Sequence, residues 1–258
     1  MPLDEITISK AIIETYTKKL LDHLEVDVAI VGGGPAGLCC AYYLAQNNIK
    51  TALFERKLAI GGGMWGGGMM FNEIVVQKKA KAVLDEFGIR YREFEKDYYT
   101  ADSLESVALL CAKALQAGAT IFNCISAEDV MIRENRITGL VLNWTPVDLA
   151  RMHVDPLTVK AKFVIDATGH DSEVVRVAER KSGLKLKTPD GKIMGEQSMW
   201  ADIGEERTVK NSREICAGLY VIGMSANAVH GDPRMGPIFG GMLLSGKKVA
   251  EELIKKMA

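Results

Sequence analysis

The sequence predicts an α/β protein built around a central parallel sheet. Three observations support this fold class. A glycine turn joins a short apolar strand to a helix within residues 26–46, and a second strand over Thr51–Phe54 ends in Glu55. Further apolar strands then alternate with helical segments up to the C-terminus. Strand, helix and parallel strand together form a βαβ unit, the repeating unit of parallel sheets.

Composition limits the class of protein. The chain has 258 residues, of which 48% are hydrophobic and 25% charged, as in a globular protein with a sizeable core. The absence of a repeat or a low-complexity linker favours one domain over residues 1–258. A formal net charge of −1 gives no reason to expect nucleic acid as a partner. No apolar run is long enough to span a membrane and no signal-peptide pattern is present, so we expect no membrane partner and a cytoplasmic location.

The first elements follow from the spacing of apolar residues. Residues 4–24 are predicted to form an amphipathic helix, because large apolar side chains recur at three- and four-residue intervals. A strand over 26–31, a helix over Pro35–Gln46 and the strand Thr51–Phe54 follow. The next stretch, 60–71, contains six glycines in two triplets. Such a stretch cannot form the interior of an ordinary helix or strand.

The remaining elements are predicted in the same way. Helical patterns occupy about 75–87 and 103–117, and the chain closes with a helix over 236–257 that begins with glycines. The predicted strands are 119–124, a hairpin over 127–144 that turns at Glu134–Asn135, a buried strand over 160–169, and 218–224. We expect the hairpin region, about 128–160, to form an antiparallel β layer beside the parallel sheet.

The cysteines indicate no special chemistry. None of the five forms a C-x-x-C pair, so neither a zinc site nor a dithiol redox site is predicted. Buried, inert thiols are the expectation for all of them: Cys39, Cys40, Cys111, Cys124 and Cys216.

The glycine turn carries the chemistry of a dinucleotide site. Gly32, Gly34 and Gly37 match G-x-G-x-x-G directly between a strand and a helix. The first glycine permits a tight turn, the second lets the backbone approach a pyrophosphate, and the third lets strand and helix pack closely. Free N–H groups at the helix N-terminus attract phosphate. Glu55, which is 18 residues past Gly37, is placed to accept hydrogen bonds from ribose hydroxyls.

The identity of the dinucleotide stays open on these residues. Arg56 would suit the 2′-phosphate of NADP, but Glu55 beside it would repel that group. A free ribose is therefore favoured, as in NAD, FAD or a related ADP-containing ligand. The stretches 164–169 ("VIDATG") and 218–242 add glycine turns at two more strand ends. Together these features are typical of the FAD/NAD(P)-binding, Rossmann-like three-layer fold.

Five segments carry a more specific resemblance. They are "DVAIVGGGPAGLCCAYYLA", "GGGMWGGGMMF", "NWTPVDLARMHVDP", "DATGHDSE" and "RMGPIFGGMLLSGKKVAE". From about residue 5 to its C-terminus, the chain resembles the thiamine thiazole synthase family. The resemblance implies that NAD is a substrate. Nicotinamide leaves, the ADP-ribose isomerises to a ketone and glycine condenses with it. Addition of sulfur and ring closure with loss of water then give an adenylated thiazole carboxylate.

The stretch "RMHVDP" (151–156) indicates the source of sulfur within that family. In the fungal and plant enzymes, the position that matches His153 is a cysteine. That cysteine donates its own sulfur, which inactivates the enzyme after one turnover. An imidazole has no sulfur to give. The chain therefore resembles the archaeal branch, a sulfide-dependent adenosine diphosphate thiazole synthase (a transferase) that uses external sulfide and Fe(II) over repeated turnovers.

The resemblance also implies roles for single residues. Asp155 and His170 would be the iron ligands, donated by neighbouring protomers of a homo-octamer, and His153 would transfer protons. Arg234 would bind the glycine carboxylate through its two-pronged guanidinium. The positions expected to contact the nucleotide, besides the three motif glycines, are Ala36, Glu55, Arg56, Gly63, Ala127, His153, Val154, Asp155 and Met224. His23, His230 and Asp232 receive no role.

The residues alone leave other interpretations open. A His-x-Asp pair in a polar loop is more often solvated than metal-bound, and His170 alone could simply cap a helix. An FAD-dependent oxidoreductase of the same fold is one alternative function, and a non-catalytic nucleotide-binding module is another. A ribose-1,5-bisphosphate isomerase would fit the ketose-forming step but leaves the adenosine site unexplained.

Overall fold

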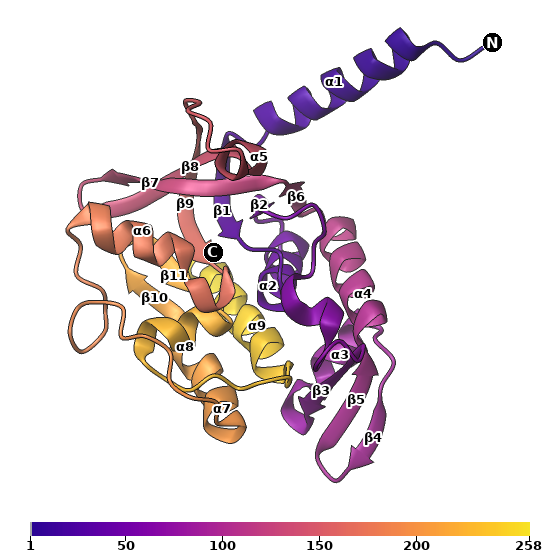
Figure 1. Cartoon of the computed structure of the whole chain (residues 1–258), viewed down its shortest axis with the longest axis vertical. Coiled ribbons are helices and arrows are strands. Elements are labelled where there is room, and N and C mark those ends of the chain that lie inside the picture. The colour runs from indigo at the N-terminus through magenta and orange to yellow at the C-terminus, as the bar shows by residue number, and fades with distance from the viewer. Residues whose placement is uncertain (1) are drawn as a thin grey trace.

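A mostly parallel sheet forms the centre of the computed structural model, which describes residues 2–258 (Figure 1). Its strand order is β10-β11-β9-β1-β2-β6. The five strands from β11 to β6 run parallel, and β10 lies antiparallel at the edge. This confirms the predicted fold class. The strands are β1 (Glu25–Val31), β2 (Thr51–Glu55), β6 (Thr120–Asn123), β9 (Leu157–Asp166), β10 (Arg213–Cys216) and β11 (Leu219–Val221).

Strand β9 belongs to two parts of the fold. Its first residues pair antiparallel with β8 (Arg136–Trp144), which forms a hairpin with β7 (Ile125–Arg133). Its last residues, Val164–Asp166, lie parallel between β1 and β11. The hairpin turns at Glu134 and Asn135, whose φ angles of 49° and 59° are typical of a two-residue hairpin turn. The predicted antiparallel layer is therefore present.

Side chains alternate between the two faces of the central sheet. In β1, Val28 and Ile30 pack beneath the helices α2 (Pro35–Gln46), α4 (Ser103–Gln116) and α9 (Gly240–Met257). Ala29 and Val31 face the β7–β8 hairpin and α6 (Glu173–Ser182) on the other side. A strand that is apolar on both faces must be covered on both, which explains the three layers.

A second, three-stranded antiparallel sheet was not predicted. It has the order β3-β5-β4, with β3 at Glu73–Gln77, β4 at Arg92–Glu95 and β5 at Tyr98–Asp102. The predicted helix over 75–87 is therefore wrong in its first part: β3 and the short turn η2 (Lys78–Ala80) precede α3 (Lys81–Phe87). Ile74 and Val76 are fully buried at a spacing of two residues, which fits a strand paired with β5.

Several shorter elements complete the chain. The strand predicted over 218–224 ends at Val221, because Gly223 turns the chain at a φ of 63°. The closing helix begins at Gly240. Besides the second sheet, the elements without a sequence prediction include β10, η1 (Gly62–Gly66), α5 (Thr145–Leu149), η3 (Gly169–Asp171), α7 (Ala201–Asn211) and α8 (Met224–His230).

The cysteine prediction holds for three residues of five. Cys39, Cys40 and Cys216 are buried, and burial raises the pKa of each thiol. Cys111 and Cys124 are only partly buried, so the expectation of burial was wrong for these two. All five are free thiols.

The N-terminal helix α1 (Glu5–Leu21) projects away from the rest of the molecule (Figure 1). It is shorter than the predicted 4–24: the Asp4 carboxylate caps it by accepting from the Thr7 N–H at 2.8 Å, and β1 begins at Glu25. No residue of α1 is buried. Several large apolar side chains on and beside α1 are exposed: Leu3, Ile6, Ile12, Ile13 and Leu21. No helix within residues 2–258 is long and apolar enough to cross a membrane.

Candidate functional site

A cavity of about 590 Å³ lies at the carboxyl ends of β1, β2 and β9. This is the position where ligands bind in open α/β sheets. Residues from distant parts of the chain meet here. The sequence-predicted residues that line it are Gly32, Gly34, Ala36, Glu55, Arg56, Gly63, Ala127, His170, Met224 and Arg234.

The glycine turn has the packing expected of a dinucleotide motif. Gly32 has a φ of 106°, and a Cβ there would lie 2.3 Å from the Ala167 carbonyl oxygen. Gly37 does not line the cavity; a Cβ on it would lie 2.1 Å from the Gly32 carbonyl oxygen. No larger residue fits at either position without moving the turn. The first turn of α2 therefore lies close under the cavity, where its N–H groups can bind an anion.

Glu55 is buried at the end of β2 and held in one orientation. Its Oε2 accepts from the Gly33 N–H at 2.7 Å, and its Oε1 accepts from the Lys57 N–H at 2.8 Å. Each carboxylate oxygen can accept a second hydrogen bond. Glu55 can therefore bind ribose hydroxyls while it also fixes the glycine turn.

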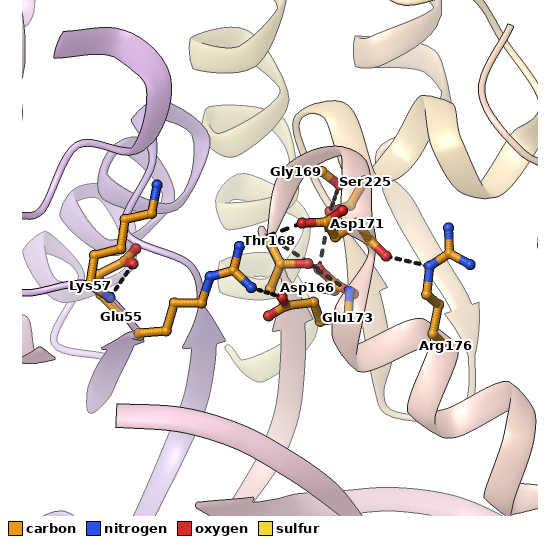
Figure 2. A network of polar contacts seen from close by, with 10 residues as sticks. Glu55, Lys57, Asp166, Thr168, Gly169, Asp171, Glu173, Arg176 and Ser225 are labelled. Atoms are coloured by element: carbon orange, nitrogen blue, oxygen red, sulfur yellow. Dashed lines mark hydrogen bonds and ion pairs between the residues drawn. The ribbon is translucent and has the colours of Figure 1, made fainter. Parts of the chain in front are cut away.

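A fully buried aspartate, Asp166, organises the opposite wall, and sequence reasoning missed it (Figure 2). Its Oδ1 accepts from the Thr168 hydroxyl at 2.7 Å and the Ser225 hydroxyl at 3.0 Å. Its Oδ2 accepts from the Val175 N–H at 3.0 Å. Burial raises the pKa of Asp166, while these hydrogen bonds lower it. The network fastens the end of β9 to the starts of α6 and α8.

Arg56 forms ion pairs with Glu173 at the start of α6 and with Asp171 of the preceding η3 turn, and these contacts were also not predicted. Its Nη1 contacts the Glu173 carboxylate, and its Nη2 lies 3.5 Å from Asp171 Oδ2. The Glu173 N–H donates to the Thr168 hydroxyl at 2.8 Å, so the Asp166 network also positions this carboxylate. Burial raises the pKa of Glu173, and Arg56 opposes that change. The guanidinium of Arg56 is thereby held beside two carboxylates.

His170 and Arg234 bring different chemistry to the same cavity. His170 lies in the η3 turn, half-exposed, and its Nδ1 is 2.7 Å from Glu196 Oε1. Arg234 is exposed, and its guanidinium has no carboxylate partner within residues 2–258. A free guanidinium at a cavity wall is available to bind the carboxylate of a small ligand.

The loop Arg151–Pro156 lies outside this cavity. Its residues His153, Val154 and Asp155 are exposed and do not line the cavity of their own chain. Across residues 2–258, no three His, Cys, Asp or Glu side chains gather into a metal site. Contribution of this loop to the site of a neighbouring protomer stays a prediction.

Comparison with known proteins identifies the family. The family model described as the Thi4 family matches residues 9–239. A thiamine thiazole synthase from Methanothermobacter thermautotrophicus is 62% identical over 257 residues, covering 100% of both chains. The chain belongs to the Thi4 family. Its similarity to the thiamine thiazole synthase of Pyrococcus horikoshii, at 56% identity over 99% of each chain, agrees with this.

A solved structure of the same family has the same fold. The crystal structure of Thermovibrio ammonificans THI4 matches with a TM-score of 0.96 and 54% sequence identity, over 100% of this chain and 99% of the other. The resemblance to the thiamine thiazole synthase family, drawn from five sequence segments, is thus confirmed.

Proposed function

We propose that this chain is a thiamine thiazole synthase that converts NAD, glycine and sulfide into an adenylated thiazole carboxylate with release of nicotinamide, in an Fe(II)-dependent reaction with multiple turnovers. Family membership and full-length similarity to proteins named thiamine thiazole synthase support an enzyme of thiazole synthesis. The residues of the cavity and of the Arg151–Pro156 loop support the choice of substrates and metal.

The observation that carries the proposal is the content of one cavity. It combines a dinucleotide-binding glycine turn with an imidazole and an unpaired guanidinium. The free guanidinium provides a binding group for the carboxylate of an amino acid beside the dinucleotide, as a reaction between the two requires.

Each residue would contribute a separate function. The N–H groups of α2 would bind the pyrophosphate, and Glu55 would accept from the ribose hydroxyls. Arg234 would hold glycine by its carboxylate, so that the amine can approach the carbonyl derived from ribose. His153, supplied by a second chain, would transfer protons near neutral pH.

The residues present suit a ferrous ion. His170 offers an imidazole on the cavity wall, and Asp155 offers a carboxylate on an exposed loop, which are ligand types that Fe(II) accepts. When bound, the iron would act as a Lewis acid that holds sulfide in deprotonated form. Two protein ligands leave most of its coordination positions open.

A homo-oligomer, which we propose to be an octamer, would bring these ligands together. Asp155 and His170 do not share the cavity of one chain, so a neighbouring protomer would have to supply the loop. The exposed apolar side chains on and beside α1 support association with a second copy, because solvated patches of this kind are unfavourable.

Anaerobic incubation of the purified protein with NAD, glycine, sulfide and Fe(II) tests the proposal. Mass spectrometry should detect an adenylated thiazole in more than one equivalent per chain, together with free nicotinamide. Omission of sulfide should abolish the product, because no cysteine occupies position 153. Unchanged NAD, or a purified protein with flavin absorbance, would contradict the proposed function.

A further inference from the structure

We infer that Glu196 is a positioning residue that fixes the tautomer and orientation of His170, so that Nε2 is the nitrogen that receives the metal. This inference deepens the proposed function and rests on it for the metal. No sequence motif includes Glu196.

The contact between the two side chains is close and two-pronged. His170 Nδ1 lies 2.7 Å from Glu196 Oε1 and 3.0 Å from Oε2. The histidine side chain is 50% exposed, whereas that of Glu196 is only 20% exposed. His170 lines the cavity, whereas Glu196 does not.

The chemistry of the two groups selects one tautomer. An ionised carboxylate can only accept hydrogen bonds, so Nδ1 must carry the proton. A neutral ring then has its lone pair on Nε2. His170 Nε2 has no hydrogen-bond partner within residues 2–258 and is available as a ligand. Histidines that bind metals commonly donate their other N–H to a carboxylate in this way.

The backbone on both sides of Glu196 is fixed. The Gly195 N–H donates to the Ala228 carbonyl of α8 at 3.0 Å, and the Gln197 N–H donates to the Asp232 carbonyl at 3.2 Å. On the histidine side, the single hydroxyl proton of Ser225 in α8 is shared between the Gly169 carbonyl, at 2.9 Å, and Asp166 Oδ1, at 3.0 Å. Both partners are therefore attached to α8.

The same segment is also connected to the proposed glycine-binding arginine. The Arg234 N–H donates to the Gln197 carbonyl at 3.3 Å, and the Trp200 N–H donates to the Arg234 carbonyl at 2.9 Å. Residues 195–200 thus hold His170 and Arg234 in a constant spatial relation. Metal and amino acid would meet at this segment.

The test measures the tautomer in metal-free protein. The chain has four histidines, so histidine can be labelled with ¹⁵N and the His170 signals assigned by comparison with His170→Ala. Solid-state ¹⁵N NMR at pH 8, above the ordinary titration range of histidine, applies to an assembly of any size. The wild type should show a protonated Nδ1 and a bare Nε2. In Glu196→Ala, protonated Nε2 should become populated.

Metal affinity provides a second readout. Glu196→Ala should weaken binding of Co(II), a spectroscopic substitute for Fe(II), by about 10- to 100-fold. Glu196→Gln should restore part of the affinity, because its carbonyl oxygen can still accept from Nδ1. Glu206→Ala removes an exposed carboxylate from α7 and controls for the change in charge. Its affinity for Co(II) should equal that of the wild type. Affinity for NAD should be unchanged in all three.

The outcomes separate this inference from the proposed function. An unchanged His170 tautomer in Glu196→Ala would overturn the role of Glu196, even if Co(II) binding weakened. A changed tautomer in a protein whose wild-type His170 Nε2 signal does not respond to Co(II) would confirm the orienting contact and overturn the assignment of His170 as a metal ligand.

Discussion

Replacement of Glu205 by glutamine should remove a pH dependence of folding stability between about pH 4.5 and 7. Glu205 is buried in α7, and its Oε1 accepts from the Gly241 N–H at the start of α9, at 2.5 Å. Its Oε2 is buried without a hydrogen-bond partner, and so is Gln77 Oε1. A proton on Glu205 removes the unpaired buried charge. Burial is the main cause that raises the pKa of Glu205, from 4.5 to about 7.

The magnitude follows from that change in pKa. A pKa raised from 4.5 to about 7 corresponds to about 3 kcal/mol of unfolding free energy, since each pKa unit is worth about 1.4 kcal/mol. The folded protein binds this proton more tightly than the unfolded chain. The contribution is therefore fully present below about pH 4.5 and is lost as the pH rises through about 7. The glutamine variant, which stays neutral, should lose less stability over this interval.

Urea unfolding of both proteins at a fixed protein concentration, from pH 4.5 to 8, measures this difference. The two should have similar free energies of unfolding at pH 4.5, and the variant should be more stable by up to about 3 kcal/mol at pH 8. Glu206→Gln, on the next and exposed position of α7, should follow the wild type. Parallel profiles for the wild type and Glu205→Gln would refute the reasoning.

Three further predictions concern the site. Gly37→Ala places a Cβ 2.1 Å from the Gly32 carbonyl oxygen, so NAD affinity measured by calorimetry should fall at least about tenfold, and an unchanged affinity would contradict the packing argument. Glu173→Gln weakens the ion pair that holds Arg56, so Arg56 can bind the 2′-phosphate of NADP. The affinity for NADP relative to NAD should rise about tenfold, since a hydrogen bond to a charged group contributes about 1.5–3 kcal/mol, and an unchanged ratio of the two affinities would show that Glu173 does not control Arg56. His153→Cys should permit a single sulfur transfer from the protein, seen by mass spectrometry as loss of H₂S at that residue, and an intact cysteine after product appears would rule it out.

Local sequence patterns predicted the parts of the site that depend on short segments. The glycine turn and Glu55 are set by a strand, a turn and a helix that are contiguous, and the Glu134–Asn135 hairpin has a local turn signal. Asp166 lies inside a recognised motif, but its role depends on burial and on Ser225 far along the chain. Neither burial nor a contact between residues so far apart in the chain produces a periodic pattern that could be recognised in the sequence.

The segment around Glu196 was the hardest part to predict. Residues 183–200 contain no helix or strand, and their order comes from hydrogen bonds to α8 and to the loop that follows it. The β3-β5-β4 sheet was missed because its strands are short and β4 is exposed along its whole length. His153 and Asp155 lie on an exposed loop outside the cavity, and their proposed place in the site of a second chain concerns assembly, which neither the sequence nor one folded chain describes.

The position of β9 between β1 and β11 bears on how the protein is made. The ribosome synthesises β1 and β2 early. Strand β9, which pairs with β1 on the side away from β2, is made only with residues 157–166, and β11 only with residues 219–221. The walls of the cavity include Arg234 and Met242 near the end of the chain. We therefore expect an unfinished chain to expose an open sheet edge without a nucleotide site. Added NAD should not protect nascent chains that stop before α9 from proteolysis.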